Sequence, residues 1–178
     1  MKQVGIWNGQ DDPIGLLHQR MNAGPEQTYG FEFKFFHAEQ IRYSLEQAVQ
    51  QFVAAGFDCF IVLKRHNYLR KIVSSLIAME TARWFIPHTA QAKPTSTRVE
   101  IGNLSMDKQE KPLLAFLANY DAQFARLDGL LRDLPVLRLS YEDDIDSDPV
   151  AAYVKACEFL DTPIHPTAIR YGRTTLGR

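Results

Sequence analysis

The chain has few cysteines and no long apolar run. Its two cysteines, Cys59 and Cys157, both lie among apolar residues, a pattern that favours buried thiols in a reducing compartment. No apolar run approaches the roughly 18 residues that a membrane-spanning helix needs. The first twenty residues contain no apolar signal-peptide segment. We therefore expect a cytoplasmic protein with no membrane partner.

Strong charge of either sign is also missing. The formal net charge is −1, from 20 Lys and Arg residues and 21 Asp and Glu residues, so nothing global indicates binding to nucleic acid or to a membrane surface. Any basic site must be local. His18, His88 and His165 are scattered without metal-ligand spacing, and we expect no metal site. The Cys-x-x-Cys, Gly-x-Ser-x-Gly and Gly-x-x-x-x-Gly-Lys motifs are absent as well.

The apolar residues that are present predict alternating strands and helices. A chain of 178 residues with 46% hydrophobic content is expected to form one domain, residues 1–178. The predicted strands are residues 31–36, 57–63 and 135–140. The predicted helices are residues 40–55, the segment from the basic turn after residue 63 to Pro87, the segment from Pro112 to Leu131, and a helix with Asp148 as N-cap and Pro149 in its first turn. Residues 1–30 and 87–109 are expected to be irregular. This order predicts an α/β fold with a mainly parallel central sheet. Ligand sites of such sheets lie at the carboxyl ends of the strands, here near His37, residues 64–66 and residues 140–142.

The most informative segment is the basic turn after the second predicted strand. It contains Lys64, Arg65, Arg70 and Lys71, and it opens a helix that carries Ser74. A helix N-terminus presents N–H groups and a partial positive charge, and neighbouring cations add charge-assisted hydrogen bonds. The turn therefore predicts a phosphate-binding site. The alternatives are a solvated basic helix start and, for Ser74, a hydrogen bond back to the helix backbone.

This segment is similar to the 3′-phosphate-binding segment of sulfotransferases that use 3′-phosphoadenosine 5′-phosphosulfate (PAPS). In that family, an arginine at a strand end is followed by a serine on the next helix. Arg65 and Ser74 are nine residues apart, and His66 and Ser74 are eight apart. The family's arginine position therefore falls on either Arg65 or His66. The fit is best with the bacterial and carbohydrate-type members.

A second region, which follows the third predicted strand, resembles the YEDL, DP and FL motifs of the same family. It comprises Tyr141-Glu142-Asp143-Asp144, Asp148-Pro149 and Phe159-Leu160. The two resemblances occur in the family's order, and together they cover roughly residues 30–175. The alternative for residues 141–144 is a segment that only caps and turns the chain, which is largely its role in the family.

The resemblance implies a three-layer α/β/α architecture of the P-loop NTPase-like sulfotransferase type. It implies PAPS as the sulfuryl donor and 3′,5′-adenosine bisphosphate as the product. Arg65, Ser74 and His66 would bind the 3′-phosphate of the nucleotide. Arg173 belongs to a segment that corresponds to the family's C-terminal loop, which closes over that phosphate.

The first predicted strand resembles the strand that carries the family's lysine or catalytic base. The resemblance implies that Lys34 faces the phosphosulfate and that His37 removes the proton of the acceptor. An imidazole suits this task because it titrates near neutral pH. Glu39 is the other candidate base, and a histidine without a catalytic role is the alternative for His37. The acceptor is expected to be a hydroxyl group, with carbohydrate as its expected class.

The family's 5′-phosphosulfate loop has no counterpart near the N-terminus. Residues 4–9, Val-Gly-Ile-Trp-Asn-Gly, contain no basic residue, and no Ser or Thr directly follows them. Such a loop supplies N–H groups and a cation to the transferring group, which are large terms in this kind of reaction. We therefore expect an N-terminally incomplete member or a divergent one. The alternatives are a non-catalytic nucleotide-binding or interaction domain of this fold and, less in keeping with the missing loop, a different phosphoryl-transfer enzyme.

Overall fold

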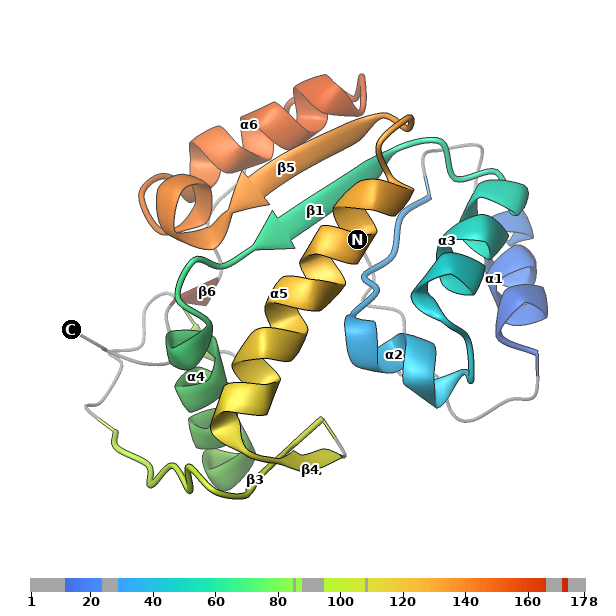
Figure 1. The fold of residues 1–178 in the computed structure, drawn as a ribbon. Helices are drawn as coiled ribbons and strands as arrows, with labels where there is room; N and C mark the ends of the chain where they lie inside the picture. The colour runs from blue at the N-terminus through green and yellow to red at the C-terminus, as the bar shows by residue number, and fades with distance from the viewer. Residues whose placement is uncertain are drawn as a thin grey trace. The chain divides into compact units, whose positions relative to one another are not determined.

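The computed structural model describes residues 12–23, 29–84, 86–87, 95–107, 109–165 and 171–172 (Figure 1). The chain divides into two compact units. Unit 1 comprises Met1–Asp58 and Leu127–Asp133, and unit 2 comprises Cys59–Arg126 and Leu134–Arg178. Each unit is described by itself, and the single domain predicted over residues 1–178 stays a prediction.

The described part of unit 1 contains a helix where the sequence predicted irregular chain. Helix α1 (Pro13–Asn22) has Asp12 as its N-cap, and the side chain of Asp12 accepts a hydrogen bond from the Gly15 N–H at 2.7 Å. The Asp12-Pro13 pair, which also fits a turn, is here an N-cap followed by a proline at the first helical position. The prediction of irregular structure is therefore wrong for these residues.

The strand predicted over residues 31–36 is also wrong. The chain is extended up to Lys34 but does not pair with a neighbouring strand of the described residues. Helix α2 (Phe35–Gln40) follows directly. The rings of Phe31 and Phe33 both pack edge-on against Phe52, with centroid distances of 5.1 and 4.9 Å. Alternate residues of an extended segment point to one side, so the alternation was real. Its apolar side is covered by a helix and not by a neighbouring strand.

Helix α3 (Leu45–Ala54) confirms most of the helix predicted over residues 40–55. Ser44 caps it, since its hydroxyl accepts from the Gln47 N–H at 3.1 Å while the Gln47 side chain accepts from the Ser44 N–H. The helix ends before Gly56, which adopts the left-handed φ of 97° that terminates many helices. Phe52 is buried on its inner face and is the centre of the aromatic cluster of unit 1.

Unit 2 contains the two parallel strands that the sequence predicted. Strand β1 (Phe60–Lys64) pairs in parallel with β5 (Val136–Ser140), and Lys64 is opposite Ser140 at their carboxyl ends. The two strands lie side by side in Figure 1. The chain is thus a mixed α/β protein whose parallel sheet, within the described ranges, has two strands.

The remaining strands are short and antiparallel. Strand β2 (Ile86–Pro87) pairs with β6 (Tyr171–Gly172), and β3 (Leu104–Met106) pairs with β4 (Gln109–Lys111). The irregular segment predicted over residues 87–109 therefore contains strand residues near its end. Leu104 and Met106, on alternate positions of β3, are both buried, so this strand contributes to the core of unit 2.

Three long helices follow the predicted order. They are α4 (Tyr68–Thr81), α5 (Leu113–Leu130) and α6 (Pro149–Phe159). Asp148 caps α6 as predicted, because its side chain accepts from the N–H groups of Val150 and Ala151 at 3.0 Å. Cys157 is a buried thiol on α6, as the sequence predicted, whereas Cys59, directly before β1, is only half-buried. No helix in the described part of the chain is long and apolar enough to cross a membrane.

Candidate functional site

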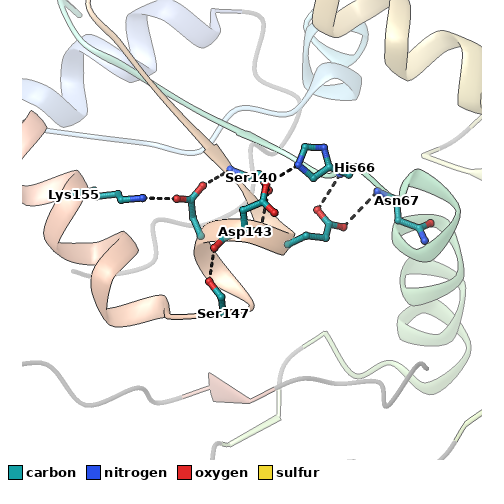
Figure 2. Close-up of polar contacts among 8 residues, drawn as sticks. His66, Asn67, Ser140, Asp143, Ser147 and Lys155 are labelled. Atoms are coloured by element: carbon teal, nitrogen blue, oxygen red, sulfur yellow. Dashed lines mark hydrogen bonds and ion pairs between the residues drawn. The ribbon is translucent and has the colours of Figure 1, made fainter.

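The candidate site lies at the carboxyl ends of β1 and β5, within unit 2. The turn Arg65–Asn67 connects β1 to α4, and the π-helical turn η1 (Tyr141–Ile145) follows β5 directly. Because β1 and β5 pair in parallel, these two segments are neighbours at the same edge of the sheet. This edge is where ligands bind to parallel sheets. Figure 2 shows the polar contacts that join the two segments.

Glu142 holds the backbone of the basic turn. Its Oε2 accepts a hydrogen bond from the His66 N–H at 2.9 Å, and its Oε1 accepts a longer one from the Asn67 N–H at 3.4 Å. Partial burial raises the pKa of the Glu142 carboxyl, but these bonds and the charge of Arg65 outweigh it, so the pKa lies below its usual value. The N–H groups of His66 and Asn67, in the turn that precedes α4, are thus already bound to a carboxylate.

The residues on either side of Glu142 hold the side chains of the same turn. The guanidinium of Arg65 lies 3.7 Å from the centre of the Tyr141 ring, a cation–π contact. The imidazole Nε2 of His66 lies 2.8 Å from Oδ2 of Asp143. The side chains of His66 and Asp143 are 60% and 73% exposed, so water weakens this pair. We call the segment Tyr141-Glu142-Asp143 the clasp, since its three residues contact the three consecutive residues of the turn, Arg65, His66 and Asn67.

The turn η1 is built by local caps and one ion pair. The Ser140 hydroxyl accepts from the Asp143 N–H at 3.0 Å, and Asp144 accepts from the Ser140 N–H at 2.8 Å. Lys155 of α6 lies 2.6 Å from the other oxygen of Asp144. The hydroxyl of Ser147 donates to the Asp143 carbonyl. Residues 141–144 therefore do cap and turn the chain, as one of the two interpretations of the sequence held.

These contacts lower the pKa of two more carboxyls. Hydrogen bonds from His66 and Ser140 lower the pKa of Asp143. The hydrogen bond from Lys155 lowers the pKa of Asp144, and Asp144 in turn raises the pKa of Lys155. The carboxylates of η1 are thus stabilised in their charged forms by the groups around them.

Acid is expected to destabilise unit 2 through these carboxyls. A pKa that is lower in the folded chain gives stability that is present above the unfolded value and is lost as the pH falls through the folded value. The loss should therefore begin below about pH 4. Urea unfolding between pH 7 and pH 3 tests this, with Glu142→Gln and, as a control, the exposed Glu158→Gln. The midpoint of Glu142→Gln should fall less steeply than that of the wild type. Equal slopes for all three chains would contradict the assignment.

One face of α4 carries the polar residues that the sequence singled out. Spacings of three and four place Asn67, Arg70, Lys71 and Ser74 on one side of the helix. Asn67 is the N-cap and accepts from the Arg70 N–H at 2.9 Å, and the Lys71 ammonium lies 4.0 Å from the centre of the Tyr120 ring. Ser74 is half-buried and lies ~9 Å along the axis from the start of the helix. Its role as a phosphate ligand stays a prediction.

The residues expected to be catalytic lie in unit 1 and not at a strand end. His37 belongs to α2, and its Nδ1 accepts a hydrogen bond from the Lys34 N–H at 3.0 Å. The imidazole also packs edge-on against the rings of Phe33 and Phe36. A neutral imidazole whose Nδ1 accepts a hydrogen bond carries its proton on Nε2. In this geometry, His37 has no Nδ1 lone pair with which to accept a substrate proton.

The structure brings together some of the predicted site residues. Lys34 and His37 contact each other in unit 1, and the ammonium of Lys34 lies 3.5 Å from Glu32 on the surface. Arg65 and His66 form one turn in unit 2. Arg173 lies outside the described residues.

Glu142, which binds the turn, was not among the site residues predicted from the sequence. A usable signal was present, since an acidic run follows one strand of a predicted parallel pair and a basic run follows the other. Complementary charges at neighbouring strand ends attract each other, but that the two strands are neighbours is known only from the structure.

Comparisons with models of protein families, with curated proteins and with solved structures found no match. The resemblance to sulfotransferases therefore remains a hypothesis from the motifs. The function has to be argued from the site itself.

Proposed function

We propose that this chain is a sulfotransferase-like protein that transfers the sulfuryl group of PAPS to a hydroxyl acceptor of the carbohydrate class. The proposal includes the three-layer, P-loop NTPase-like architecture, of which β1 and β5 would be the described parallel strands. One observation carries it. A strand, a turn with Arg65 and a helix with Ser74 follow one another at the carboxyl end of a parallel strand pair.

The local charges support a nucleotide with a phosphate at this end of the sheet. Arg65 directly follows β1. Arg70 and Lys71 lie on the same face of α4 as Ser74, about one helical turn before it. A guanidinium binds phosphate through two parallel hydrogen bonds, and an ammonium adds a point charge. In the proposed site, Arg65 and Ser74, with His66 beside them, bind the 3′-phosphate.

The proposed reaction moves one sulfuryl group and one proton. The acceptor oxygen attacks the sulfur while the bond from sulfur to the 5′-phosphate oxygen breaks, which leaves 3′,5′-adenosine bisphosphate. The acceptor proton goes to a base, and Lys34 balances the charge of the transferring group. His37 serves as the base once its Nδ1 releases the Lys34 N–H, because a neutral imidazole has only one nitrogen that accepts a proton.

Loss of Arg65 is expected to weaken nucleotide binding by about 10- to 100-fold. A hydrogen bond to a charged group contributes about 1.5–3 kcal/mol, and each 1.4 kcal/mol is about tenfold in affinity. Calorimetry with 3′,5′-adenosine bisphosphate measures this for the wild type and Arg65→Ala. Arg98→Ala is the matched control, because Arg98 is 89% exposed and forms a surface ion pair with Glu100. No binding by the wild type, or equal binding by Arg65→Ala, would reject the site.

A second function is favoured by the contact of His37. A base whose Nδ1 is bound to the backbone suits a non-catalytic nucleotide-binding or interaction domain better than an enzyme. The same protein preparations discriminate the two. A sulfotransferase shows sulfuryl transfer from PAPS that His37→Ala abolishes while nucleotide affinity stays unchanged. A non-catalytic domain shows no transfer to a panel of carbohydrate hydroxyls and equal nucleotide affinity for both chains.

A further inference from the structure

The clasp already contacts the Arg65 guanidinium, the His66 ring and the N–H groups of His66 and Asn67 in the β1–α4 turn. Tyr141 contacts the Arg65 guanidinium, Glu142 accepts from the N–H of His66, and Asp143 binds the His66 ring. We propose that the clasp is an autoinhibitory contact, which must release the turn before a ligand phosphate can bind there. This inference rests on the proposed function, since it concerns the regulation of the same site.

The exclusion follows from hydrogen bonding and charge. An N–H group makes one strong hydrogen bond, so the His66 N–H donates either to Glu142 or to a phosphate oxygen. A phosphate at this turn would also stand beside the carboxylates of Glu142 and Asp143, and like charges at short range repel each other. The closed clasp therefore keeps anions away from Arg65 and His66.

The surroundings of the clasp determine how it opens. Asp144 is tied to Lys155 of α6 and to the Ser140 N–H, with distances of 2.6 and 2.8 Å. These contacts hold η1 to α6 and β5 while the side chains of the clasp rotate. The ring of His66 and the carboxylate of Asp143 are mostly exposed, so water can replace their contact at small cost. Opening thus requires the rotation of side chains and no movement of a helix.

The test compares nucleotide affinity with the clasp intact and with its charges removed. The double variant Glu142→Gln, Asp143→Asn keeps the size of both side chains and removes both charges. Its affinity for 3′,5′-adenosine bisphosphate, measured by calorimetry, should rise about tenfold over the wild type. Glu158→Gln, Asp161→Asn is the matched control, since it removes two exposed charges of unit 2 away from the turn and should leave the affinity unchanged.

A second probe separates this inference from the proposed function. Inorganic phosphate is titrated while the amide signals of His66 and Asn67 are followed by NMR, which also verifies that the variant is folded. If neither chain binds the nucleotide but phosphate shifts these signals in the double variant alone, the autoinhibitory role of the clasp is supported and the proposed nucleotide function is rejected. If the wild type binds the nucleotide and the double variant binds it equally or more weakly, the autoinhibitory role of the clasp is rejected and nucleotide binding is supported. If neither probe affects either chain, both are rejected.

Discussion

Phe52→Ala is expected to lower the free energy of unfolding by about 3–5 kcal/mol. Phe52 is 7% exposed, and the rings of Phe31 and Phe33 pack against it at centroid distances of 5.1 and 4.9 Å. Its removal would leave a cavity where an extended segment and a helix meet, and edge-to-face ring contacts would be lost in addition to buried area. Urea unfolding followed by far-UV circular dichroism measures the loss.

Val53→Ala is the matched control for this prediction. Val53 follows Phe52 on α3 but faces outward and is 43% exposed. Its truncation should cost no more than about 0.5 kcal/mol. If Phe52→Ala were no more destabilising than Val53→Ala, the aromatic cluster would not be the core of unit 1. The described packing of Phe31 and Phe33 on α3 would then be incorrect.

Ile72→Ala is expected to lower the free energy of unfolding by about 2–5 kcal/mol. Ile72 lies on α4 and has no exposed surface. It precedes Ser74 by two positions, and this spacing places it on the opposite face of the helix from the candidate phosphate ligands. The variant therefore removes support beneath the candidate site while it retains each of the site's polar side chains.

The matched control for this variant is Ile101→Ala. Ile101 belongs to the same unit and is 66% exposed, so the same truncation should change the stability by no more than about 0.5 kcal/mol. Urea unfolding gives the two free energies, and hydrogen exchange of the β1 amides attributes the loss to unit 2. Equal effects of the two substitutions would show that Ile72 is not a core residue.

The clasp limits how available the basic turn is to an external anion. A helix start with Arg65, Arg70 and Lys71 attracts anions in general. In this chain, the turn is already contacted by two of the chain's own carboxylates, Glu142 at 2.9 Å from the His66 backbone nitrogen and Asp143 at 2.8 Å from the His66 ring. In the proposed mechanism, a ligand phosphate competes with these internal carboxylates for the turn. The nucleotide experiments measure the outcome of that competition directly.

Local features of the fold were predictable because they depend on near neighbours in the chain. Asp148 and Pro149 predicted the start of α6, since an N-cap and its proline act within the first turn. The apolar runs predicted β1 and β5. The same local logic failed for α1, because an aspartate followed by a proline fits both a turn and a helix start.

The partner of an apolar face was not predictable from spacing alone. Phe31 and Phe33 alternate as strand residues do, yet they pack on Phe52 of a helix. A period of two shows that a segment is extended and has one apolar side. It does not show whether a strand or a helix covers that side. For this reason, His37 was expected at a strand end and lies in α2.

The sequence by itself determined the ends of several elements and the basic turn that follows β1. Only the tertiary structure decided what the turn binds within the chain. Glu142 and His66 are 76 positions apart, and they meet because β1 and β5 pair in parallel with Lys64 opposite Ser140. A contact of this kind depends on the register of two distant strands, and no local pattern of residues specifies that register by itself.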